Sequence, residues 1–226
     1  MNTNLSSYPK HTNLIYPLAV ICLVLISNCA TKPPHETGTF KPNDLIELVK
    51  LDTSIHLDIR YATSNNFIGR PVYKEARAFL QRPAAEDLVK VNKELKLLGY
   101  GLLIFDGYRP WSVTKIFWDI TPKEKKEFVA DPKEGSKHNR GCAIDLSLYE
   151  IASGKEVQMT GQYDEMSERS YPGYTGGTAE QRRMRDLLRS KMEVNGFTVE
   201  DNEWWHFNYK DWKSYGIGNT QFWKIK

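Results

Sequence analysis

Two short stretches of this sequence carry side chains that could bind a metal ion and transfer protons. His138 and Asp145 belong to the stretch SKHNRGCAID, and Glu203 and His206 belong to the stretch EWWH. Two imidazoles and a carboxylate, with a fourth position left open, form a common ligand set for catalytic zinc. A further carboxylate beside such a site can take a proton from water and deliver it to a leaving amine. If both stretches lie together in the fold, this chemistry indicates a hydrolase.

Alternating side chains predict that two of these residues lie on strands. In the stretch CAIDLSLY, Asp145 lies on the opposite face from Ile144 and Leu146. In the stretch WWHFNY, His206 lies on the opposite face from Phe207. Successive side chains of a strand point to opposite faces of the sheet. If the two strands are neighbours, Asp145 and His206 therefore point to the same side.

The other two residues need local departures from a straight strand. His138 precedes Asp145 by an odd number of residues, so an unbroken strand would place it on the wrong face. Gly141 permits a turn that would bring it back. Glu203 and His206 are also separated by an odd number, which predicts a bend or bulge between them. Each spacing alone also occurs by chance, and the alternative is a surface His138 with a hydrogen-bonded His206 in the core.

The remaining elements predict the fold class. Apolar residues at helical spacing follow Pro83 and stop at Gly99. Capping-box patterns predict a short helix after Thr121 and a longer one that begins at Thr178 and ends at Asn195. A strand is predicted in YGLLIFDGYRP, between the first and second helices. Because the order does not repeat as strand–helix–strand, we expect a single α+β domain with a mainly antiparallel sheet and flanking helices.

Length and composition suit one globular domain. The chain has 226 residues, of which 40% are hydrophobic, and a formal net charge of +3. This small excess gives no indication of nucleic-acid binding, which would need clustered basic residues. Cys142 is the only cysteine outside the first 29 residues. We therefore expect no intramolecular disulfide and interpret Cys142 as a small buried residue.

The start of the chain resembles a bacterial targeting segment. Residues 1–28 contain an apolar run that is too short to span a bilayer but fits a signal peptide. The run ends at ISNC, which is similar to a lipoprotein cleavage box with Cys29 as the lipidated residue, although Asn28 is larger than usual there. Residues 29–42 are expected to be a polar linker, and residues 43–226 the folded domain. The alternative is an uncleaved membrane anchor.

The two polar stretches also resemble those of a known family. Ser-x-His-x-x-Gly-x-Ala-x-Asp at residues 136–145, followed by Glu-x-Trp-His at residues 203–206, is similar to the signature of the D-alanyl-D-alanine dipeptidases, the VanX-type zinc peptidases. Their wider relatives include D,D-carboxypeptidases and the hedgehog amino-terminal domain. The likeness extends through RYATSNNFIGRPVY, GYGLLIFDGYRP, AIDLSLY and MSERS, and covers roughly residues 43–212.

The resemblance implies a role for each matching residue. The family's ligands for one zinc ion per chain match His138, Asp145 and His206. Glu203 matches the catalytic acid and base. Arg109 matches an arginine that holds the oxyanion, a role that suits a fixed guanidinium; the alternative is a buried ion pair with Asp106.

The resemblance also implies how a dipeptide is held. Tyr61 and Asp164 match residues that take the free amino group, and Ser136 matches one that meets the carboxylate. An anion such as Asp164 offsets the dehydration of an ammonium group, whereas Tyr61 could equally be a core residue. The 26 residues between Arg109 and Ser136 form a shorter segment than is expected in the resistance enzymes. The strictness for dipeptides is therefore open.

Together these expectations describe an exported enzyme of the bacterial cell envelope. It would hydrolyse D-alanyl-D-alanine with zinc, in wall turnover or dipeptide salvage, and could attach to the membrane through a lipidated Cys29. One alternative is a D,D- or L,D-carboxypeptidase that trims peptidoglycan stems. Another is a non-catalytic wall-binding module with structural zinc, which would need neither Glu203 nor Arg109. The oligomeric state does not follow from the sequence.

Overall fold

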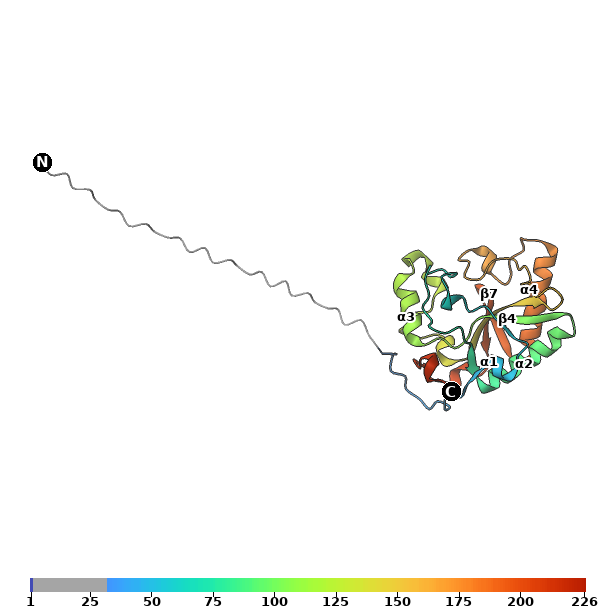
Figure 1. The fold of residues 1–226 in the computed structure, drawn as a ribbon, viewed down its shortest axis with the longest axis horizontal. Helices are drawn as coiled ribbons and strands as arrows, with labels where there is room; N and C mark the ends of the chain where they lie inside the picture. Colours follow the sequence, from blue (N-terminus) through green and yellow to red (C-terminus); the bar gives the residue numbers. More distant parts are fainter. Residues whose placement is uncertain (2–31) are drawn as a thin grey trace.

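The computed structural model describes Met1 and residues 32–226 of the chain (Figure 1). The expected signal segment and Cys29 lie outside the described residues. Within residues 32–226, no helix combines the length and apolar character needed to cross a membrane.

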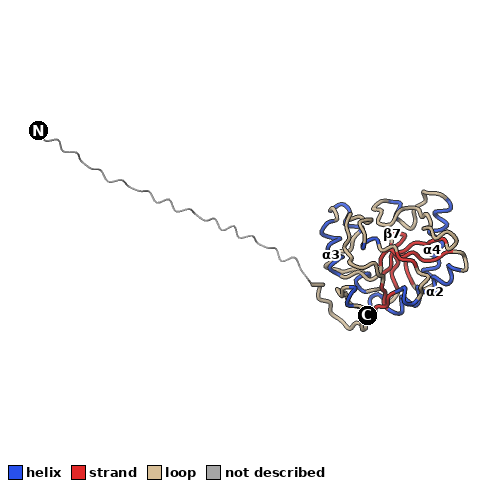
Figure 2. The backbone as a smooth tube through the Cα atoms, viewed as in Figure 1, coloured by secondary structure: helices blue, strands red, loops and turns tan. Residues whose placement is uncertain are grey.

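A five-stranded sheet forms the centre of the described part of the domain, with helices and loops around it (Figure 2). Its strands, in spatial order, are β2 (His56–Leu57), β4 (Tyr100–Asp106), β5 (Ala143–Glu150), β7 (Glu203–Tyr209) and β6 (Phe197–Glu200). The pair β2–β4 is parallel, and the other three pairs are antiparallel. A separate antiparallel pair joins β1 (Leu45–Glu47) to β3 (Phe79–Gln81). The expected α+β class with a mainly antiparallel sheet is confirmed.

Helices and short 3-10 turns surround this sheet. The α-helices of the described residues are α1 (Leu48–Leu51), α2 (Arg82–Lys96), α3 (Trp111–Ile120) and α4 (Ala179–Val194). The 3-10 helices of the same part are η1 (Arg60–Ala62), η2 (Lys123–Phe128), η3 (His138–Arg140), η4 (Glu168–Ser170), η5 (Trp212–Ser214) and η6 (Phe222–Lys224). Helices α2 and α4 contact each other and the sheet, whereas α3 lies on the other side of the domain (Figure 1).

Two of the three predicted helices are confirmed. Helix α2 has Pro83 in its first turn and buries the apolar face that the spacing predicted, although Leu98 lies beyond its end and is half exposed. Helix α4 begins with the expected capping box. The backbone N–H of Thr178 donates to Gln181 Oε1 (2.8 Å), and the N–H of Gln181 donates to Thr178 Oγ1 (3.1 Å).

The prediction of a capped helix after Thr121 is wrong. This segment is the 3-10 helix η2, and Thr121 instead ends α3 by donating its hydroxyl to the carbonyl of Phe117 (2.7 Å). Helix α3 itself was not predicted. Its aromatic and β-branched residues have low helix propensity, but burial of Val113 and Phe117 stabilises it in the fold.

Strand β5 is buried on both of its faces. Every residue from Ala143 to Tyr149 is buried, including the polar Asp145 and Ser147. Cys142, just before this strand, is also buried, as expected, and is a free cysteine in the described part of the chain. A carboxylate in this position must be stabilised by protein groups or a cation, because very little of it is exposed to water.

Residues 32–42 contain no helix or strand, yet they contact the domain. The Glu36 carboxylate accepts hydrogen bonds from Arg140 Nη2 (2.5 Å) and from the backbone N–H of Ile217 (2.6 Å). The N–H of Lys41 donates to the carbonyl of Ser214 (2.8 Å). This segment was expected to be a linker, but its described part packs along the chain before the C-terminus.

Candidate active site

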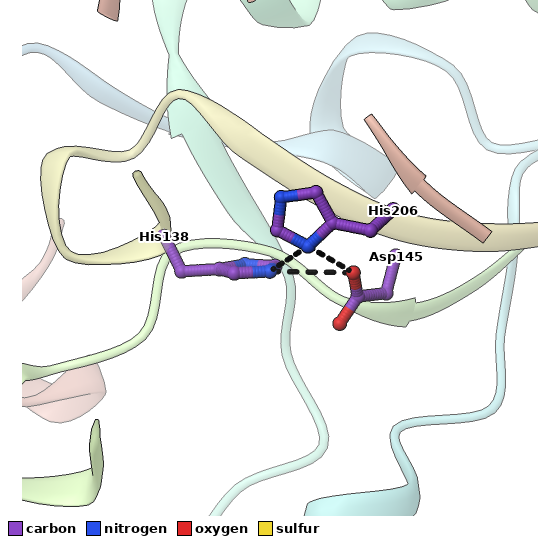
Figure 3. Close-up of side chains that lie close together, drawn as sticks. All are labelled: His138, Asp145 and His206. Carbon is purple, nitrogen blue, oxygen red and sulfur yellow. Dashed lines mark hydrogen bonds and ion pairs between the residues drawn. The ribbon is translucent and has the colours of Figure 1, made fainter. Parts of the chain in front are cut away.

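Two neighbouring strands and one turn bring three candidate ligands together (Figure 3). Strands β5 and β7 are antiparallel, and Asp145 is paired directly with His206, so both side chains lie on the same face as predicted. His138 lies on η3, and Gly141 after it adopts a left-handed conformation with φ of 67°. This turn returns His138 to the strand face, as the sequence required.

The candidate ligand atoms of these three residues face one another at short distances. His138 Nδ1 donates to the carbonyl of Gly107 (2.7 Å), and His206 Nε2 donates to Asn208 Oδ1 (2.8 Å). Each ring therefore directs its other nitrogen, which carries a lone pair in the neutral imidazole, toward Asp145. His138 Nε2 lies 3.3 Å and His206 Nδ1 3.1 Å from Asp145 Oδ1, and the two nitrogens are 3.1 Å apart.

The arrangement of these three donor atoms favours a cation between them, either a proton or a metal ion. Asp145 Oδ1 is buried and, while both imidazoles are neutral, has no hydrogen-bond donor among the described residues. Burial alone would lower the pKa of His206, but its hydrogen bond to Asp145 and the nearby carboxylates raise it to about 9. The same negative charge that holds a proton on this imidazole would hold a metal ion. The ligand atoms of His138, Asp145 and His206 all lie within 4.8 Å of one another, so they fit a single ion.

Glu203 lies beside this group at the start of β7. The register of β6 against β7 shifts between Val199 and Glu200, which confirms the expected irregularity. As a result, Glu203 Oε2 lies 3.5 Å from His206 Nδ1. Burial raises the pKa of Glu203 to about 7, with Asp145 adding to the shift and His206 opposing it. A carboxyl group with such a pKa suits proton transfer near neutral pH.

Arg109 forms the buried ion pair with Asp106 that the sequence left as an alternative, and its guanidinium also faces the candidate metal ligands. It is buried, its Nε donates to Asp106 Oδ2 (2.8 Å), and its Nη2 lies 3.5 Å from Asp145 Oδ2. Tyr73 also donates to Asp106 (2.9 Å). Gly107 lies between Asp106 and Arg109. Only glycine fits there, because a Cβ would lie 2.7 Å from the carbonyl oxygen of Phe79 in β3. The ion pair therefore fixes the guanidinium beside the candidate metal ligands.

Tyr61 and Asp164 form a second polar group in the cleft. The Tyr61 hydroxyl donates to Asp164 Oδ1 (2.9 Å), whereas Asp164 Oδ2 is buried with no partner among the described residues. Burial raises the pKa of Asp164 well above its usual range. Asp164 also has a φ of 61°, which is unusual for a residue with a side chain. Tyr61 packs in the core as well, with its ring 4.6 Å from that of Phe117.

Ser136 supports the turn that carries His138. Its Oγ accepts the backbone N–H of His138 (3.1 Å), which leaves its own hydroxyl proton free to donate. The residues predicted for the site all line one cleft of about 470 Å³, and they are Tyr61, Arg109, Ser136, His138, Asp145, Asp164, Glu203 and His206. The sequence did not indicate Lys137 and Glu200, which line the same cleft, because their contacts depend on the fold.

Comparison with known proteins assigns the chain to a family. The model of the D-Ala-D-Ala dipeptidase family, peptidase family M15, matches residues 41–223. The chain belongs to this family. It is 33% identical to a D-alanyl-D-alanine dipeptidase of Escherichia coli (strain K12). The alignment spans 179 residues and covers 79% of this chain and 91% of that protein. It is also 36% identical to a D-alanyl-D-alanine dipeptidase of Enterococcus faecium, in an alignment of 182 residues that covers 71% of this chain and 90% of that protein.

A solved structure also matches this member of the dipeptidase family, though more distantly. The vancomycin resistance D,D-dipeptidase VanXYg, in complex with a D-Ala-D-Ala phosphinate analog, is 20% identical, covers 74% of this chain and 67% of that chain, and has a TM-score of 0.41. This likeness adds nothing to the assignment. The sequence matches confirm the expected enzyme class, a metallopeptidase, and disfavour the non-catalytic module.

Proposed function

We propose that this protein hydrolyses the dipeptide D-alanyl-D-alanine with one zinc ion held by His138, Asp145 and His206. The observation that carries the proposal is the convergence of three donor atoms that can bind one metal ion, with Glu203 beside them and not among them. Mixed nitrogen and oxygen donors with an open position suit catalytic zinc. Membership of the dipeptidase family supports the substrate.

The side chains around the three metal ligands would each have a separate role in the reaction. Zinc, when bound, supplies a Lewis acid that polarises the peptide carbonyl and lowers the pKa of water. Glu203 takes the proton of the attacking water and passes it to the leaving amino group, which its raised pKa allows. Arg109 directs its Nη2 toward the negative charge that develops on the carbonyl oxygen.

The charged ends of the dipeptide explain the other polar groups. Asp164 Oδ2 has no partner among the described residues, so an ammonium group would satisfy it, with Tyr61 holding the other carboxylate oxygen. The free hydroxyl proton of Ser136 can be donated to the substrate carboxylate. A site that requires both ends within one cleft disfavours longer peptides.

Assays of purified protein on three peptides test this function. We expect zinc-loaded protein to cleave D-alanyl-D-alanine, but neither L-alanyl-L-alanine nor a peptidoglycan stem pentapeptide. Chelation should abolish cleavage and added zinc restore it, and His206→Ala should lose the metal. Faster cleavage of the pentapeptide would favour the carboxypeptidase alternative. A protein that binds zinc and cleaves none of the three would contradict the proposed activity.

We further propose that the protein is exported and anchored through a lipidated Cys29. The apolar run and the ISNC box support this location. An exported enzyme cannot reach a cytoplasmic pool of dipeptide, so wall-derived dipeptide in turnover or salvage is the better substrate pool. The anchor would also hold the domain near the membrane, because only six residues separate Cys29 from the docked Glu36.

Replacing Cys29 tests the anchor. We expect Cys29→Ala to convert a membrane-associated protein into a soluble or unprocessed one, because the acyl chains supply the membrane affinity. Fractionation and intact-mass measurement would show the change. Cys22→Ala is the matched control, since this cysteine lies within the apolar run and should leave both results unchanged. Equal fractionation and mass of Cys29→Ala and wild type would show that the box is not used.

A further inference from the structure

The two histidine ligands are oriented by different kinds of group. His138 donates from Nδ1 to the backbone carbonyl of Gly107 (2.7 Å), which no substitution can remove. His206 donates from Nε2 to the side chain of Asn208 (2.8 Å), two residues further along β7. Asn208 is itself buried. The orientation of His206 therefore depends on a side chain that can be changed.

A carboxylate decides which end of the Asn208 amide faces His206. Asn208 Nδ2 lies 2.6 Å from Glu200 Oε2 on β6. Because an ionised carboxylate only accepts hydrogen bonds, the NH₂ group of Asn208 must face Glu200 and its oxygen must face the imidazole. An amide oxygen also only accepts, so His206 must carry its proton on Nε2. In the neutral imidazole, the lone pair of Nδ1 then points toward Asp145 and His138, where a metal ion needs it.

Lys137 is the last member of this chain of hydrogen bonds, which runs from His206 through Asn208 and Glu200. Its Nζ lies 2.7 Å from Glu200 Oε2, the same oxygen that accepts from Asn208. Lys137 directly precedes His138 in the sequence. The chain of hydrogen bonds therefore joins the turn that carries His138 to the strand that carries His206. An ion pair with both side chains about 30% exposed contributes little by itself. Its consequence here is to hold a buried amide in one orientation.

We propose that Asn208, oriented by Glu200 and Lys137, is a positioning residue that fixes His206 in the tautomer that binds the metal. This inference rests on the proposed function, because it assumes zinc at these ligands. Groups that hydrogen-bond to a metal-binding histidine set its tautomer and ring orientation, and their loss typically weakens metal binding by about 10–100-fold.

Zinc affinity tests the role of Asn208. We expect Asn208→Ala in the full-length protein to raise the Kd for zinc by about 10–100-fold, measured by competition with a chromophoric chelator. Asn195→Ala is the matched control, because the Asn195 amide also donates to a carboxylate, Glu94 (3.2 Å), but at the end of α4. This control should bind zinc as the wild type does. Circular dichroism would show whether both variants remain folded.

Exchanging the two side chains separates positioning from packing. The double variant Glu200→Gln/Asn208→Asp keeps the net charge and reverses only the hydrogen bond between positions 200 and 208, so Lys137 and His206 still donate. The oxygen of the new amide can accept from Lys137 and its NH₂ group can donate to the new carboxylate, after a rotation of the amide because both wild-type bonds meet at Glu200 Oε2. The carboxylate can then accept from His206 Nε2. We expect this variant to recover most of the zinc affinity lost in Asn208→Ala, whereas a purely packing role gives no reason for recovery.

Nuclear magnetic resonance reads the tautomer directly. Long-range correlations to imidazole ¹⁵N in the zinc-loaded wild type should show the proton of His206 on Nε2. A proton on Nδ1, an unchanged Kd in folded Asn208→Ala, or no recovery in the exchange variant would each overturn the inference. A wild-type protein that fails to bind zinc would overturn the proposed function as well, so the two failures are distinguishable.

Discussion

Replacing Glu203 with glutamine is expected to lower kcat for D-alanyl-D-alanine by at least about a hundredfold, with zinc still bound. Glutamine keeps the size of the side chain but cannot take a proton from water. Glu203 Oε2 lies 3.5 Å from His206 Nδ1, beside the ligand group and outside it. Because proton transfer matters in the transition state, KM should change far less than kcat. Steady-state kinetics and metal analysis of the same preparation would measure both effects.

A second glutamate of the cleft provides the control. Glu127 lines the same cleft from η2 with an exposed side chain, and it contacts Asn202 through its backbone carbonyl. Glu127→Gln should therefore leave kcat nearly unchanged. Wild-type turnover in zinc-loaded Glu203→Gln would show that another group moves the proton and would contradict the mechanism.

Local periodicity predicted the part of the site that lies on strands. Alternation predicted that Asp145 and His206 would share a face if their strands were neighbours, and β5 and β7 pair these two residues directly. The odd spacing from Glu203 to His206 predicted an irregular strand, which the shifted register of β6 against β7 provides. These predictions succeeded because a strand side chain has only two directions, so spacing limits the possible geometries.

Local patterns failed where two elements compete for one residue. The pattern after Thr121 fits a capping box, but the hydroxyl of Thr121 instead bonds to the carbonyl of Phe117 at the end of α3. Helix α3 escaped prediction because its stability comes from burying Phe117 and its neighbours and not from helix propensity. A sequence pattern cannot show which of two adjacent elements a capping residue joins.

Contacts between distant residues could not be predicted from spacing at all. Tyr61 and Asp164 are 103 positions apart, and only the family resemblance indicated that they act together. Lys137 and Glu200 are 63 positions apart, and neither spacing nor resemblance indicated their contact. Such pairs depend on how the loops pack around the sheet, which is tertiary information.

Replacing Arg109 with lysine is expected to lower kcat by ~10²–10³-fold, the usual loss for one oxyanion donor. Arginine can donate from Nε to Asp106 while Nη2 faces the reacting carbonyl, but the single ammonium group of lysine cannot hold both positions. Lysine keeps the positive charge and is the better test, because alanine would leave the buried Asp106 without its ion pair and destabilise the fold.

The matched control is another arginine that lines the cleft. The guanidinium of Arg140 is held by Glu36 (2.5 Å) and by the carbonyl of Tyr215 (2.5 Å), away from the reacting groups. Arg140→Lys should therefore change kcat only slightly. Thermal unfolding and zinc content should show that Arg109→Lys is folded and metal-loaded. A wild-type rate in Arg109→Lys would contradict the proposed role of Arg109 and leave only its ion pair with Asp106. Other groups of the cleft would then have to stabilise the developing oxyanion.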